Sequence, residues 1–161
     1  MMRRILIHGL ALLALCCLAT AVMAGNSANH TVTVTVNSIN QVAIVGGNIT
    51  LTISTATAGS NPNNASDSTT CDLNWTTNES DKKITVATNL AVQKFTLKVV
   101  AQNVAGGTAA AQVTITDTAA DLVTAITTTL GTCDLSYTAI ATAAEGTGSD
   151  VHTVTYTLID E

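Results

Sequence analysis

The sequence predicts an all-β protein built as a single antiparallel β-sandwich, and three observations predict it. Short segments that alternate apolar and hydroxyl side chains recur about every ten residues, with glycine- or asparagine-rich turns between them. Threonine and valine are abundant, while proline occurs once and aromatic residues make up 2% of the chain. No long helical pattern is present that could support a parallel sheet.

Each expected strand follows from local alternation and its flanking turns. Residues 31–36 alternate strictly between threonine and valine, and residues 48–54 repeat this pattern after two glycines. Residues 117–126 are ambiguous, because residues 119–122 could form one helical turn. The other expected strands are residues 70–76, 83–88, 94–101, 111–116, a segment from 132 toward 144, and 152–159. About 7–9 short antiparallel strands are typical of an immunoglobulin-like sandwich.

A duplicated phrase, Thr-Cys-Asp-Leu-x-aromatic-Thr, occurs at residues 70–76 and again at residues 132–138. Alternation places the cysteine, the leucine and the aromatic ring of each copy on one face, so each copy reads as a half-buried strand. Cys71 and Cys133 therefore occupy one local register on two similar strands. This predicts a disulfide that pins the sandwich, with two separately buried free thiols as the alternative.

The first residues predict a secretory signal peptide at residues 1–24. Two arginines precede an apolar run, and Val22-Met23-Ala24 ends the run with small residues of the kind that signal peptidase accepts. An uncleaved membrane anchor is the alternative, because the run approaches spanning length. Cleavage predicts a secreted protein, extracellular or at the cell surface, with no membrane partner. Cys71 and Cys133 would then be its only cysteines, in an oxidising compartment.

Charge further limits the possible partners. After cleavage, four lysines face eleven carboxylates, so the formal net charge falls from −5 to −7. A chain this acidic and poor in cations does not favour nucleic acid as a partner. Its length suits one domain, expected at residues 38–161, preceded by an N-terminal strand at residues 25–37.

The N-terminal strand carries the main functional hypothesis. Its residues Thr31, Val32, Thr33, Val34, Thr35 and Val36 include no charge and no proline and have high β-propensity. These properties are those of an aggregation-prone sheet edge, so the strand must pair with something. It pairs either within its own domain or as an arm that adds a strand to a neighbouring subunit. The similar threonine-rich run at 152–157 is equally explained as shared strand chemistry.

The signal peptide, the β-rich N-terminal segment, the sandwich with one expected disulfide and the Thr/Ala/Gly-rich composition together resemble secreted bacterial fimbrial or filament subunits. The resemblance is architectural and rests on no diagnostic motif. It implies a structural protein that polymerises with copies of itself by donating an N-terminal strand. Neither a Leu-Pro-x-Thr-Gly sorting signal nor the penultimate-aromatic and paired-glycine signatures of the family are found in the sequence.

The sequence offers little support for an enzyme, and no catalytic residue, cofactor or metal is expected. His30 and His152 sit at strand ends and would make an incomplete metal site. Asp72 and Asp134 hold equivalent outward positions, but no aromatic sugar platform accompanies them.

The alternative function is a monomeric secreted binding module for carbohydrate, calcium or an adhesin-type ligand. Its candidate loops are residues 61–67 and 79–81, and Trp75 and Tyr137 are expected to pack inward, which leaves Tyr156 as the main aromatic candidate. Five Asn-x-Ser/Thr sequons begin at residues 29, 48, 64, 74 and 78 and would be glycosylation sites in a eukaryote.

Overall fold

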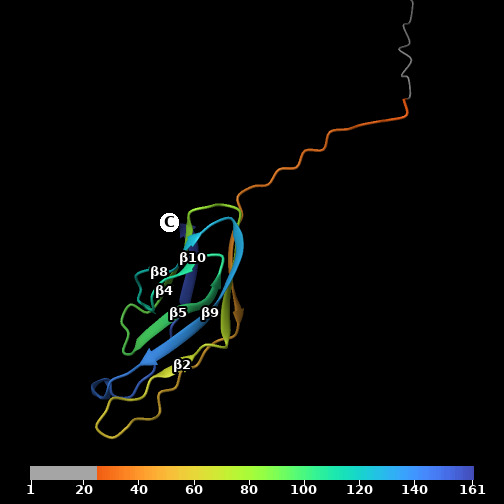
Figure 1. The fold of residues 1–161 in the computed structure, drawn as a ribbon. Helices are drawn as coiled ribbons and strands as arrows, with labels where there is room; N and C mark the ends of the chain where they lie inside the picture. The colour runs from red at the N-terminus through yellow and green to blue at the C-terminus, as the bar shows by residue number, and fades with distance from the viewer. Residues whose placement is uncertain (1–24) are drawn as a thin grey trace, which may run out of the picture. The chain divides into compact units, whose positions relative to one another are not determined.

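The computed structural model describes residues 25–161, and the chain divides into two units between Thr35 and Val36. Within the first unit, the described residues 25–35 form neither strand nor helix. The second unit holds the ten strands of the described chain and one short 3-10 helix, η1 (Ala143–Glu145) (Figure 1). The predicted signal peptide, residues 1–24, lies outside the described residues.

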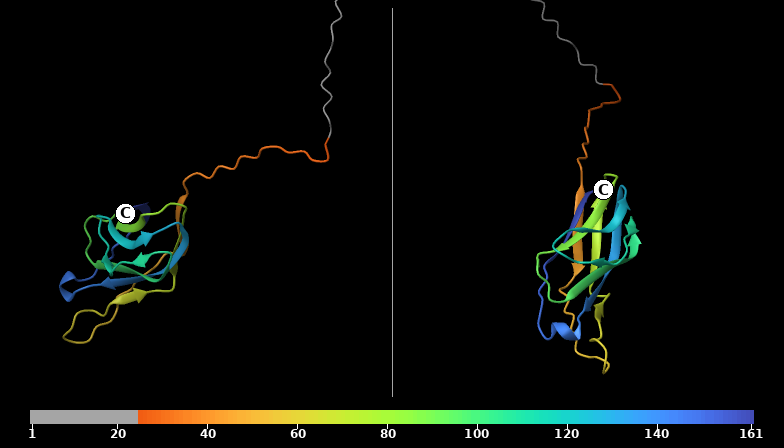
Figure 2. Two further views of the ribbon diagram at one scale, coloured as in Figure 1. Left: turned by 45° about the horizontal axis from the view of Figure 1, so that its top comes forward. Right: turned by 90° about the vertical axis from the view of Figure 1, so that its left-hand side faces the viewer.

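The strands form two antiparallel sheets, which confirms the predicted all-β class (Figure 2). The first sheet has the order β1-β3-β9-β5-β7, and β2 also pairs with β9. Its strands are β1 (Asn40–Gly46), β2 (Ala65–Asp67), β3 (Cys71–Thr77), β5 (Thr96–Ala105), β7 (Val113–Thr114) and β9 (Thr129–Ile140). The second sheet, in the order β10-β4-β8-β6, contains β4 (Lys82–Thr88), β6 (Thr108–Ala109), β8 (Ala120–Ile126) and β10 (Val154–Asp160).

The core is apolar and draws on both sheets. Leu73 and Leu135 come from the first sheet, and Ile84 and Leu122 come from the second; all four are fully buried. Burying side chains of this size stabilises the fold by about 1.5–3 kcal/mol each relative to leaving them exposed. Alternate residues of β3, and of β9 from Cys133 to Tyr137, face this core.

The duplicated phrase forms two adjacent strands, β3 and β9. Asp72 lies opposite Asp134, and Leu73 lies opposite Cys133. Every second residue of β3, from Cys71 to Thr77, is buried. The predicted alternation of the two copies is therefore confirmed.

Other expected elements differ from the structure. Residues 117–126 contain strand β8, so the helical alternative for residues 119–122 is wrong. A register shift leaves Leu122 as an extra residue between the pairs Ile84–Val123 and Thr85–Asp121. This bulge lets two successive residues face the core, which obscures the alternation in the sequence.

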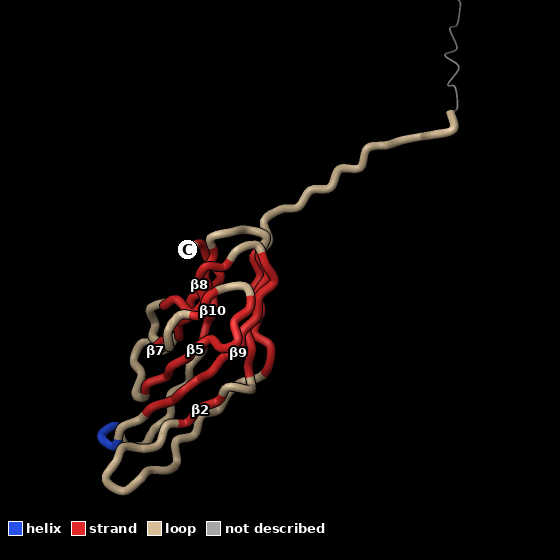
Figure 3. Tube along the Cα trace, in the orientation of Figure 1, coloured by secondary structure: helices blue, strands red, loops and turns tan. Residues whose placement is uncertain are grey.

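The N-terminal third of the chain departs most from expectation. Residues 31–36 and 48–54 were both expected as strands, but neither is one in the described chain (Figure 3). Residues 40–46, which carry the continuous apolar run Val-Ala-Ile-Val, instead form β1 and pair with β3. Alternation predicts a side chain pattern, whereas a strand also requires a partner for its backbone.

Candidate assembly surface

The N-terminal arm, defined here as residues 31–36, exposes its apolar side chains. Val32, Val34 and Val36 are 70%, 82% and 72% exposed. Valine on a lone extended segment gains nothing from packing, and alternating Thr/Val backbone has high β-propensity. The arm therefore has the chemistry of a strand without a strand's partners among the described residues.

Asn78 fixes the direction in which the chain leaves β1. Its Nδ2 donates to the carbonyl oxygen of Asn37 at 2.8 Å, and its Oδ1 accepts from the backbone N–H of Ile39 at 2.8 Å. The backbone N–H of Asn78 also donates to the carbonyl oxygen of Ile39 at 3.2 Å. These three hydrogen bonds hold residues 37–39 as an extension of β1, without a turn.

A second extended segment, residues 48–54, follows β1. Residues 47–54 form no turn or bend, and they follow Gly46, whose φ is 115°. Ile49 and Leu51 are partly buried and pack against the core, and the threonines between them are exposed. Within the described chain, no backbone–backbone hydrogen bond involves these residues. The segment thus has the side-chain arrangement of a core-facing strand, and its backbone has no strand partner in the described part of the chain.

The expected disulfide is not formed in the structure. Cys71 and Cys133 are both buried free thiols, and the described residues contain no disulfide. Because Leu73 lies opposite Cys133, Cys71 is offset from Cys133 by two residues on the adjacent strand of the same sheet. A bond between them would link two strands that are already paired and would not join the two sheets. The Sγ of Cys71 instead lies 2.8 Å from the carbonyl oxygen of Gly47.

The two sheets are joined by a partly buried hydrogen bond that the sequence did not predict. The hydroxyl groups of Tyr137 on β9 and Tyr156 on β10 are hydrogen-bonded to each other. Burial raises the pKa of both phenols, so both remain neutral and the hydrogen bond persists across the physiological range. Trp75 and Tyr137 are buried, as predicted, and Tyr156 is half-buried. The half-exposed Phe95 is the remaining aromatic residue, so no described aromatic ring forms an exposed platform for sugar stacking.

The two histidines and the paired carboxylates belong to no metal-binding cluster among residues 25–161. Nδ1 of His152 lies 3.2 Å from the hydroxyl of Thr88, and His30 is exposed. Asp72 and Asp134 face each other on adjacent strands, and Asn103 donates to Asp134 at 2.6 Å. In the described part of the chain, no three His, Cys, Asp or Glu side chains gather as a metal site.

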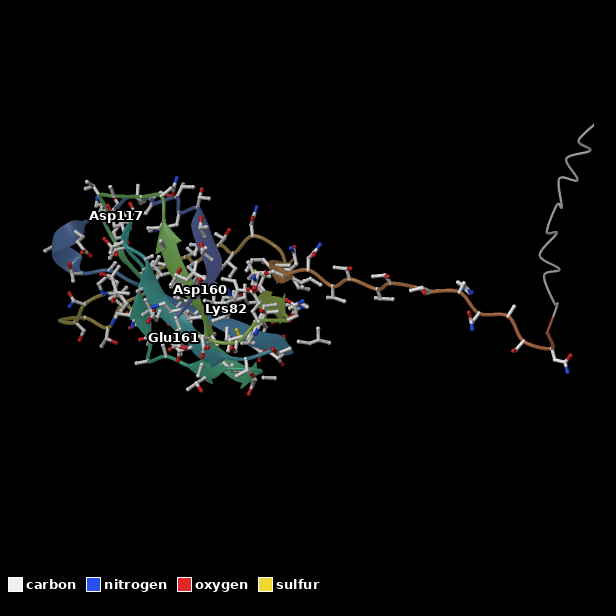
Figure 4. The ribbon with its side chains drawn as sticks, turned by 90° about the horizontal axis from the view of Figure 1, so that it is seen from above. Lys82, Asp117, Asp160 and Glu161 are labelled. Atoms are coloured by element: carbon white, nitrogen blue, oxygen red, sulfur yellow. The ribbon has the colours of Figure 1, made fainter. Side chains whose placement is uncertain are left out.

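The candidate calcium loops are occupied by internal bonds. Asp67 accepts hydrogen bonds from the hydroxyl and the backbone N–H of Thr70, and these lower the pKa of its carboxyl. Glu79 accepts from Asn40 at 2.6 Å and pairs with Lys82 at 2.8 Å. Lys82 also pairs with Asp160 (Figure 4). Asp160 and then Glu79 raise the pKa of Lys82, so Lys82 stays cationic between the two carboxylates.

One open depression of about 310 Å³ lies near the start of β5, with Lys94, Phe95, Asp117 and Glu145 among its lining residues. The Lys94 ammonium lies 5.6 Å from the Phe95 ring centroid and donates to the carbonyl oxygen of Thr147 at 2.6 Å. The volume of the depression is at the lower limit of the range for small-molecule sites, about 300–1,000 Å³. Its cation is already bound internally, so the depression offers little to a ligand.

A scan against protein-family models found no match, and a search of the curated proteins found none either. Among residues 25–161, no helix is long and apolar enough to cross a membrane.

Proposed function

We propose that this chain is a secreted structural protein, a self-assembling subunit of an extracellular filament or pilus-like fibre whose subunits are joined by β-strand donation. The proposal includes an immunoglobulin-like sandwich and a filament whose partners are copies of the same chain. One observation carries it: the arm, residues 31–36, exposes three valines on an uncharged segment of high β-propensity. Extended segments of this kind bind by adding a strand to the open edge of another sheet.

The three hydrogen bonds between Asn78 and residues 37–39, called the Asn78 clamp below, support donation of the arm to another copy. A hairpin through residues 37–39 would be needed to bring the arm back beside β1 of its own copy. The three hydrogen bonds of Asn78 hold those residues in line with β1 instead. Because residues 37–39 are held in this way, a partner in a second subunit is favoured for the arm.

Deletion of residues 25–36 tests the proposal. We expect the protein lacking them to remain a folded monomer, because the buried core lies in the second unit, whereas the protein starting at residue 25 forms oligomers that grow with concentration. Deletion of residues 25–30 alone is the matched control and should leave assembly intact. Size-exclusion chromatography with light scattering measures the mass of each form. Oligomers of unchanged size after the longer deletion would contradict the proposal.

The alternative is a monomeric binding module, for which the depression beside Lys94 is a candidate ligand site. It makes the opposite prediction for the same measurement, a monomer at every concentration.

A further inference from the structure

We propose that residues 48–54 are the acceptor edge for the arm of the next copy. This inference rests on the proposed function, because it names the element that receives the donated strand. Both segments are extended, uncharged and free of proline. They are also similar in length, six and seven residues, so one can pair along the whole of the other.

The acceptor edge differs from the two long edge strands of the sheets. β1 and β10 each lie at one end of a sheet order and have one paired side. β10 ends in the ion pair of Asp160 with Lys82, and charged groups at an edge oppose strand addition. Residues 48–54, in contrast, make no backbone–backbone hydrogen bond within residues 25–161, so an added strand would give protein partners to their donors and acceptors.

Side-chain phase fits the pairing. In residues 48–54 the odd positions, Ile49, Leu51 and Ile53, are partly buried and the even positions are exposed. The arm alternates with the same period, so its valines can continue the apolar face started by Ile49 and Leu51. Its threonines would then lie beside Thr50 and Thr52 on the outer face, and Thr–Thr pairs are favourable across strands.

The linker between the arm and β1 is too short for the arm to pair with residues 48–54 of its own copy. If residues 37–39 formed a hairpin loop, residue 36 would face Asn40 and residue 31 would face Val45. Folding back would thus bring the arm to β1. Residues 48–54 lie beyond the far end of β1, which is about 20 Å long. The arm can pair in full with residues 48–54 only in a second subunit.

Two full-length variants separate donor from acceptor. Val32→Asp with Val34→Asp disables the donor, and Thr50→Pro with Thr52→Pro removes two backbone N–H groups from the acceptor. We expect neither variant to polymerise alone, and their equimolar mixture to form a dimer of one copy of each. Loss of two backbone hydrogen bonds predicts self-association weaker by on the order of thirtyfold. Thr50→Val with Thr52→Val keeps both N–H groups and loses only the hydroxyl contacts, so it should assemble more strongly than the proline variant.

The outcomes distinguish the two proposals. If the proline variant polymerises normally while the aspartate variant does not, strand donation holds and residues 48–54 are not the acceptor. If the unchanged protein is itself monomeric at every concentration, both proposals are overturned.

Cross-linking gives a second test that does not depend on the folding of the proline variant. Thr33→Cys with Thr52→Cys should produce a ladder of disulfide-linked multimers on a non-reducing gel after mild oxidation. Thr33→Cys with Gln41→Cys places the second cysteine on β1 and should give no ladder. The reverse result would assign the acceptor to β1 and overturn the inference.

Discussion

The packing of Trp75 against Gly131 gives the sharpest test of the fold. The two residues lie opposite each other on β3 and β9, and the indole is 3% exposed. A Cβ atom at Gly131 would fall closer than 3.0 Å to three atoms of the indole ring, Cε2, Nε1 and Cζ2. The indole therefore occupies the space that any side chain at Gly131 would need.

Gly131→Ala should destabilise the domain by about 3 kcal/mol. Overpacking a core generally costs about 1–3 kcal/mol, and this site lies at the upper end because the clash is with a rigid buried ring. For a domain of this size, that loss lowers the urea midpoint by roughly 1–2 M. Equilibrium unfolding in urea, followed by far-ultraviolet circular dichroism, measures the shift.

Two controls isolate the clash. Gly47→Ala adds the same methyl group where no heavy atom lies within 4 Å, and it should change stability by less than about 0.5 kcal/mol. In a Trp75→Leu background, Gly131→Ala should cost at least about 1 kcal/mol less than in the unchanged protein, because the two positions are coupled. An equal cost in both backgrounds would refute the packing described for β3 and β9.

The remaining predictions concern titration and charge. Burial raises the pKa of Cys133 to about 11, and both cysteines are buried free thiols. Cys71 and Cys133 should therefore resist thiol reagents in the folded protein, and both should react after denaturation. A disulfide-linked peptide pair found by mass spectrometry would contradict the free thiols. The hydrogen bond from the Asn40 side chain, together with Lys82, lowers the pKa of Glu79 from 4.5 to about 2. This contribution is present above pH 4.5 and is lost as the pH falls toward 2, so Glu79→Gln should flatten the loss of stability in that window. Asp72→Asn removes one of two carboxylates that face each other. It should stabilise the folded protein by about 0.5 kcal/mol and so raise its melting temperature slightly. A lower melting temperature would argue against the register of β3 and β9.

The central strands could be predicted from the sequence because their faces differ. Cys71 to Thr77 alternates between buried and exposed positions, and the same phrase at 132–138 repeats it. Irregular patterns left residues 117–126 ambiguous and β1 unpredicted. β8 carries a bulge at Leu122, and β1 has four apolar residues in succession, so neither shows the period of two on which the prediction depended.

The composition of the arm can be read from the sequence, but the contacts of the residues that follow it cannot. The uncharged Thr/Val arm is evident in the sequence, because side-chain alternation needs no tertiary information. The Asn78 clamp joins residues that are about forty positions apart, and no local signal indicates it. The cysteine phrase gave the correct face for Cys71 and Cys133 but not the strand pairing, which decides whether a disulfide joins two sheets or lies within one.

Electron microscopy of the native protein, prepared without denaturant, tests the central claim most directly. Strand donation predicts regular filaments with a subunit repeat of a few nanometres, on the scale of one domain of this size. Aspartate at positions 32 and 34 should abolish them. Uniform single-domain particles from the unchanged protein would contradict the account.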